Sequence, residues 1–215
     1  MGFAGPEFAR FELEKMGNPA SGKEAGIVFA GNKNERWFIV FQYLADGHVN
    51  DDQHTMDADA LLASLQASNV ARNEERKKVG AKTGQLKGWY EDPHYDSRTH
   101  TLRWAVMAAQ DGGDEWVNYK AIIFGRVGMM VLTVIESPDD FPKLKPKLEE
   151  VLTGFSFTKG NAYGDWQIGD REAASSFSDF IAPGGTPKSA GVFATIGRYI
   201  TNYFVSVHRP VNQVI

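Results

Sequence analysis

Apolar positions recur with a helical period in two stretches of the chain. Between Asp57 and Lys78 they fall three or four residues apart, which predicts a helix with one buried face. A second helical pattern begins at Ser137, where a capping serine, a proline and two acids form a helix start. The two buried stripes are Ala58, Leu61, Leu62 and Leu65, and Phe141, Leu144, Leu148, Val151 and Leu152.

Short runs of β-branched and aromatic residues predict the strands. They cover residues 25–30, 36–43, 85–91, 101–109, 116–124 and 129–135, with a short returning strand at 155–158. Turn residues separate the first two runs, which indicates a hairpin, and the last four long runs indicate an antiparallel meander. The predicted fold class is α+β: an antiparallel sheet of about six strands packed by two main helices, plus a C-terminal amphipathic helix.

A Pro-Gly-Gly segment at Pro183 divides the chain. Residues 1–182 form a predicted single α+β domain, and residues 183–215 a linker and an amphipathic tail. The apolar residues of the tail include Val192, Phe193, Ile196, Tyr199, Ile200 and Tyr203. Because basic residues are few there, we expect this face to contact a protein partner or a second copy rather than an anionic membrane.

Composition excludes several classes of function. The chain has 215 residues, a net charge of −4 and no cysteine, so disulfides, thiolate metal sites and thiol catalysis are excluded, and no basic surface points to nucleic acid. No window reaches the roughly 18 apolar residues of a membrane span. The first residues lack a secretion-signal pattern.

An Asp- and His-rich loop at residues 45–55 is the candidate metal site. Its potential ligands are His48, Asp51, Asp52 and His54, because imidazole suits Zn²⁺ and carboxylates suit Mg²⁺ or Ca²⁺. The spacing matches no defined metal loop. The alternative is a solvated turn whose acids complement the N-terminus of the helix that follows.

Aromatic residues of the predicted sheet are the candidate ligand site. A groove near Trp89, Tyr95 and Trp104 would suit a small ligand. The segment 91–100 places carboxylates beside histidines, but Asp-Pro and Asp-Ser are also ordinary turn formers. The sequence contains no nucleophile elbow, P-loop or dinucleotide fingerprint, so we assign no catalytic residue and no cofactor.

Several segments resemble a bacterial family of predicted membrane-anchored proteins, known as domain of unknown function twenty-one sixty-seven. The resemblance runs through MGNPASGKEAGIVFA, RWFIVFQYLADGHVNDD, GWYEDPHYDSRTHTLRWA, VNYKAIIFGRVGMMVLTVI and NAYGDW. It implies a location at the periplasmic face of the inner membrane, although this chain shows neither the family's signal nor its anchor and is expected to be soluble or peripherally associated. The order of elements is also similar to the PsbP/Mog1-like fold, an analogy about fold alone.

These observations leave three hypotheses of function. The first is a non-catalytic binding or interaction protein, associated with the bacterial envelope or acting as an accessory subunit of a larger assembly. The second is a metal-dependent hydrolase that uses Asp51, Asp52 and His54. The third is a small-ligand carrier. The missing catalytic motif favours the first.

Overall fold

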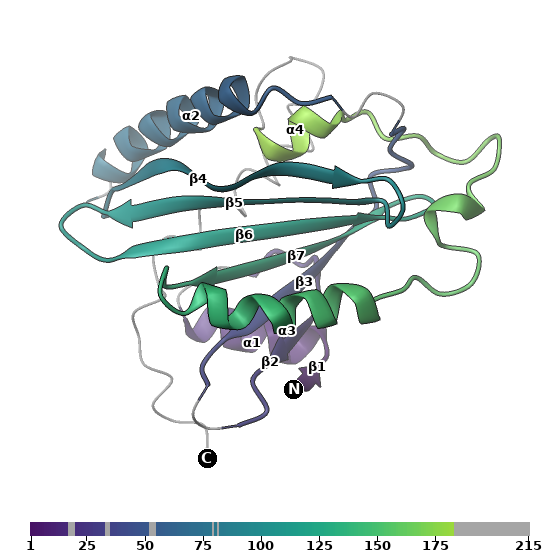
Figure 1. Ribbon diagram of the computed structural model, residues 1–215, viewed down its shortest axis with the longest axis horizontal. Helices are drawn as coiled ribbons and strands as arrows, with labels where there is room; N and C mark the ends of the chain where they lie inside the picture. Colours follow the sequence, from purple (N-terminus) through teal and green to yellow (C-terminus); the bar gives the residue numbers. More distant parts are fainter. Residues whose placement is uncertain (17–19, 33–34, 52–54, 79, 81, 183–215) are drawn as a thin grey trace.

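The fold is built on a seven-stranded antiparallel sheet of order β1-β2-β3-β7-β6-β5-β4 (Figure 1). The computed structural model describes residues 1–16, 20–32, 35–51, 55–78, 80 and 82–182. The strands are β1 (Gly2–Ala4), β2 (Glu24–Phe29), β3 (Phe38–Leu44), β4 (Gly84–Asp96), β5 (Thr101–Gln110), β6 (Glu115–Phe124) and β7 (Met129–Glu136). The helices are α1 (Pro6–Lys15), α2 (Ala58–Lys78), α3 (Phe141–Gly154) and α4 (Phe177–Ile181), with the 3₁₀ turn η1 (Tyr163–Asp165). The predicted α+β class is confirmed.

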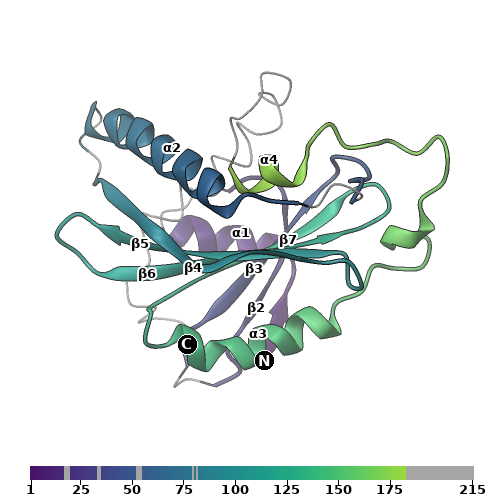
Figure 2. The same ribbon diagram turned by 45° about the horizontal axis from the view of Figure 1, so that its top comes forward.

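Helices cover both faces of the sheet (Figure 2). On one face, α3 buries Phe141, Leu144 and Leu148 against residues of β3, β5, β6 and β7. On the other face, α2 and α4 cover β4, β5 and β6, while Leu13 of α1 packs on Val40. Because the central strands are covered twice, nearly all residues of β3 and β6 are buried whichever face they point to, although β6 includes the polar residues Asn118 and Lys120.

Strand β4 is longer than the sequence predicts. It does not end at Glu91 but continues through Pro93 to Asp96, with register shifts between Leu86 and His94. The missing N–H of a proline is tolerated there because β4 is an edge strand with bulges. As a result Tyr95 lies in the sheet, opposite Leu102, and not in a loop.

Further differences from the prediction concern β1, residues 155–158 and the start of α3, and α1 adds a helix to the two main helices that were predicted. β1 adds an edge strand beside β2, so the sheet has seven strands rather than about six. Residues 155–158 form no strand; Phe155 and Phe157 instead pack against the core on the α3 side. The α3 helix begins at Phe141, since residues 138–140 form a turn in which the Asp140 N–H donates to the Ser137 hydroxyl at 3.1 Å.

No helix within the described residues combines the length and the apolar character that crossing a membrane requires.

Candidate functional site

A loop after β3 meets the β6–β7 turn and a late segment at one end of the sheet. His48 donates its backbone N–H to the Arg171 carbonyl at 2.8 Å and accepts at its own carbonyl from the Ala173 N–H at 2.7 Å. Gly47 has φ of +113°, and a Cβ there would come within 2.5 Å of the Glu172 carbonyl carbon. A glycine is therefore required where the two backbones approach each other so closely. The next residue, His48, lines the pocket of the site.

Four rings form a continuous stack at this point. The ring centroids of Trp166 and His48 are 5.2 Å apart, those of His48 and Tyr163 4.4 Å, and those of Tyr163 and His100 3.9 Å. Tyr163 belongs to η1, and its hydroxyl donates to the Val49 carbonyl at 2.8 Å. Three separate segments of the chain thus contribute rings that hold one another in place.

Asp51 lies at one end of the stack and is surrounded by donors. The Tyr95 hydroxyl donates to its Oδ2 atom, and His100 Nδ1 lies 3.2 Å from the same oxygen and 3.1 Å from the tyrosine hydroxyl. His100 has φ of +48°, the only positive φ at a non-glycine position among the described residues. The tight β4–β5 turn requires this left-handed conformation, which costs a histidine more than a glycine. The strained histidine is held by its contacts with Tyr95, Asp51 and Tyr163.

These contacts fix the charge of Asp51. Burial opposes ionisation, but hydrogen bonds from Tyr95, Tyr163 and His100 outweigh it and lower the pKa of the Asp51 carboxyl. Burial, together with the hydrogen bond to Asp51, raises the pKa of the Tyr95 hydroxyl well above its ordinary value. At neutral pH the pair is therefore a carboxylate and a neutral phenol.

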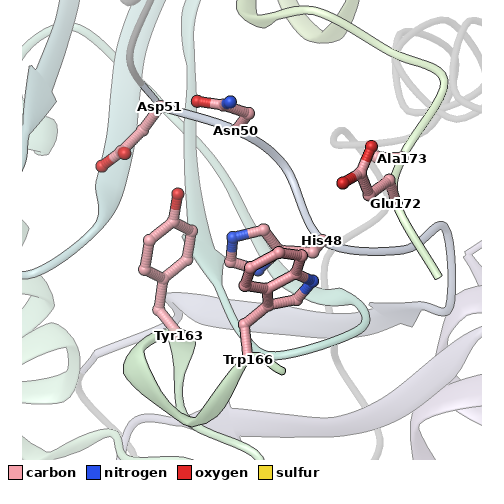
Figure 3. A pocket seen from close by; sticks show the side chains of 7 residues that line it. All are labelled: His48, Asn50, Asp51, Tyr163, Trp166, Glu172 and Ala173. Atoms are coloured by element: carbon pink, nitrogen blue, oxygen red, sulfur yellow. The ribbon is translucent and has the colours of Figure 1, made fainter. Parts of the chain in front are cut away.

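The stack lines a surface pocket of about 250 Å³ (Figure 3). Its lining residues are His48, Asn50, Asp51, Tyr163, Trp166, Glu172 and Ala173. Figure 3 shows the Tyr163 hydroxyl directed towards Asp51, with the Glu172 carboxylate lying beyond His48 on the other side. The indole Nε1–H of Trp166 is buried and has no hydrogen-bond partner among the described residues.

An ion pair holds the late segment against the turn beneath the pocket. Arg126 Nε and Nη2 donate to the two oxygens of Asp170 at 2.7 and 2.9 Å, and the Arg126 carbonyl lies 3.2 Å from His48 Nδ1. The bidentate geometry fixes both position and orientation. Since Asp170 neutralises Arg126, the charged groups that line the pocket itself are the carboxylates of Asp51 and Glu172.

Two of the four residues predicted as metal ligands, His48 and Asp51, line this pocket together. The other two, Asp52 and His54, lie outside the described residues. Within the described part of the chain, no three His, Asp or Glu side chains are grouped so that they would hold a metal ion. The metal site stays a prediction.

The three predicted ligand-binding aromatics are dispersed. Tyr95 adjoins the pocket through Asp51. Trp104 is 3 % exposed in the core beneath α2, and the indole N–H of Trp89 donates to the Ala58 carbonyl at 3.1 Å at the start of that helix. Both tryptophans therefore join α2 to the sheet rather than line the pocket.

Sequence reasoning missed the late half of the site. Tyr163, Trp166 and Glu172 come from a segment without a catalytic or ligand-binding motif, although Tyr163 and Trp166 belong to the family-like stretch NAYGDW. Tyr163 is separated by 114 residues along the chain from Val49, whose carbonyl accepts its hydroxyl hydrogen bond. The aromatic residues between Gly160 and Gly169 were the available signal, because rings in an otherwise polar segment need a surface to pack on. The predicted partner surface of the tail, from Val192 to Tyr203, lies outside the described residues.

Comparison with solved structures gives two alignments of low score. A protein of unknown function from Pseudomonas aeruginosa aligns with a TM-score of 0.34 and 14% identity, covering 61% of this chain and 81% of its own. The cyanobacterial PsbP protein from Synechocystis aligns with a TM-score of 0.35 and 8% identity, covering 63% of this chain and 75% of its own. Neither similarity transfers a function.

Comparison with sequences identifies the family. No match was found among curated proteins. The family described as "Protein of unknown function (DUF2167)" matches residues 1–211, nearly the whole chain. The chain therefore belongs to the DUF2167 family.

Proposed function

We propose that this protein is a non-catalytic binding domain, and that its pocket at His48, Tyr163 and Trp166 holds a basic segment of a protein partner. The observation that supports the proposal is the lining of the pocket, which combines stacked rings with two carboxylates. Such a domain would act as an accessory subunit of a larger assembly.

The chemistry of the lining favours a cationic group. Asp51 and Glu172 supply negative charge. Trp166 is the end ring of the stack, and a tryptophan face attracts a Lys or Arg side chain within about 6 Å of its ring centroid.

The size of the pocket favours a side chain over a free ligand. Sites for drug-sized molecules enclose about 300–1,000 Å³, whereas this pocket measures about 250 Å³. This supports a protein partner over the small-ligand carrier.

The state of Asp51 and Tyr95 is also unsuited to acid–base catalysis. A general acid or base works best when its pKa lies near the working pH. The pKa of Asp51 is lowered and that of Tyr95 is raised, so both shifts lead away from neutrality. We infer that the hydrogen bonds among Asp51, Tyr95 and His100 fix the position of the stacked rings instead.

Peptide titration tests the proposal. We expect an Arg- and Lys-containing peptide to shift the NMR signals of the Trp166 and Tyr163 side chains, and a Glu-substituted peptide of the same length to leave them unchanged. Glu172→Gln should weaken binding about twofold to fivefold, since one exposed charge contact contributes up to about 1 kcal/mol.

Glu150→Gln, which removes an exposed carboxylate from α3 on the far face of the sheet, is the matched control and should leave binding unchanged. Equal binding of both peptides, or equal loss in both variants, would contradict the proposal. A Zn²⁺-induced stabilisation that His48→Ala abolishes would instead favour the metal-dependent hydrolase.

A further inference from the structure

A small cavity between α2 and strands β4, β5 and β6 is lined by two cations, the buried Lys120 and the half-buried Arg72. Leu65, Asn69 and Arg72 follow one another on one face of α2 and line the cavity from above. Asn118 and Lys120, two residues apart on β6, line it from the sheet. The remaining walls are apolar: Leu86, Trp104, Val106 and Ile181.

Apart from Asn69, whose Oδ1 accepts from Asn73 Nδ2 at 3.4 Å, the polar side chains that line this cavity have buried atoms without partners or lack a counter-charge among the described residues. Lys120 is 4 % exposed and Asn118 2 %. Both side-chain polar atoms of Asn118 and the Nε atom of Arg72 are buried without a hydrogen bond, as is the hydroxyl of Thr133, which lies directly opposite Lys120 on β7. Within the same part of the chain, no carboxylate forms an ion pair with Arg72 or Lys120.

Such an arrangement is costly for a protein core. Buried polar groups are almost always hydrogen-bonded, and buried charges are almost always paired. Burial lowers the pKa of Lys120 to about 8, and burial followed by the neighbouring Arg76 lowers that of Arg72 to about 10. Both shifts reflect cations that lack a counter-charge.

We propose that this cavity binds a single small anion, of which chloride is the abundant example, held by the Lys120 ammonium, the Arg72 guanidinium and the amide N–H of Asn118. An anion compensates both cations at once and accepts from all three donors. The size decides the class: the cavity measures about 10 Å³, enough for about one water-sized occupant, so phosphate, sulfate and organic acids are excluded.

Thermal unfolding in different sodium salts tests the site. At constant ionic strength, replacing gluconate by chloride or bromide should raise the unfolding midpoint by about 2–6 °C, because an anion that binds only the folded state stabilises it. Sulfate at matched ionic strength stabilises folded proteins without a site, so its effect on the midpoint should be the same in the wild-type protein and in the Lys120→Met variant. Lys120→Met keeps the length of the side chain and removes the charge, so its midpoint should respond equally to chloride and gluconate.

Two results would overturn the proposal: an equal midpoint of the wild-type protein in chloride and gluconate, or a chloride response that survives in Lys120→Met. If that variant does not fold, bromide decides the question in crystals of the wild-type protein. An anomalous peak between Lys120 and Asn118 supports the site, and a cavity without one refutes it. Because the cavity lies apart from the peptide pocket, Glu172→Gln should retain the full chloride response.

Discussion

The surface pocket and the buried cavity differ in how far their polar groups are paired with one another. Around Asp51, each charge is matched: Tyr95 and His100 donate to the carboxylate, and Arg126 is paired with Asp170 nearby. Around Lys120, the buried ammonium has no counter-charge, and the Asn118 amide and the Nε atom of the half-buried Arg72 have no partners among the described residues. The first cluster satisfies its own polar groups, which fixes the shape of a site. The second leaves polar groups without partners among the described residues, which is the basis of the proposed anion site.

The largest effect is expected at Lys120. In chloride-free buffer near neutral pH, Lys120→Met should raise the free energy of unfolding by about 3 kcal/mol, because it removes a buried charge without a counter-charge, whose pKa is lowered to about 8 from 10.5. Chemical denaturation of the two proteins measures the difference. A destabilised variant would show that the ammonium is satisfied in the fold, and would remove the contrast between the clusters.

The pH dependence of that difference has a definite sign. Between about pH 8 and 10.5 the unfolded chain binds more protons at Lys120 than the folded one, so wild-type stability rises with pH in this window. The gap to Lys120→Met should therefore close there. Two other charged groups lie on the helices above the sheet: Arg72 of α2 lines the same cavity, and Asp179 of α4 accepts a hydrogen bond from Ser176. The wild-type protein and the Lys120→Met variant both contain them, so they do not contribute to the difference. A constant gap would contradict the assignment.

Removing the acceptor of the Asp51 network should have the opposite sign. Asp51→Asn is expected to destabilise the fold by about 1–3 kcal/mol, because Tyr95 and His100 lose a charged acceptor. Tyr95→Phe should cost less, and the double variant less than the sum of the two, since the groups share one network. Strict additivity in this double-mutant cycle would show that the hydrogen bond contributes no coupling.

Acid should weaken the same network. The folded pKa of Asp51 is lowered from the ordinary 3.8, so its stabilising contribution is present above that value and is lost as the pH falls through the folded pKa. In Asp51→Asn, the loss of stability below about pH 4 should be shallower. If the wild-type protein and the Asp51→Asn variant lose stability equally as the pH falls, the Asp51 carboxylate is not the source of the acid sensitivity.

The smallest effect concerns the backbone at His100. Its φ of +48° suits glycine, so His100→Gly should be more stable than His100→Ala by about 1 kcal/mol, although both lose the contact with Asp51. Comparing the two variants isolates the cost of the left-handed conformation from the loss of the side chain. Equal stabilities would show that the turn relaxes without strain.

The sequence predicted the elements better than their contacts. The stripes of α2 and α3 and the four-stranded meander follow from periodicity, which depends only on local geometry. The predicted β4 strand was too short because Asp92 and Pro93 are turn residues in most settings, whereas an edge strand with bulges accommodates them. The run at 155–158 has strand composition, but its aromatic residues pack on the core.

The sequence by itself determined the α+β class, the buried faces of the helices and the absence of thiol chemistry. It also identified His48 and Asp51 as candidate site residues. Only the tertiary structure decided that these two residues meet Tyr163, Trp166 and Glu172, and that Lys120 lies under α2 without a counter-charge among the described residues. The physical reason is the range of the interactions. The periodicity of a helix or a strand depends on residues that are close in the sequence. A pocket, or a buried charge without a counter-charge, depends on segments that the sheet brings together from distant parts of the chain.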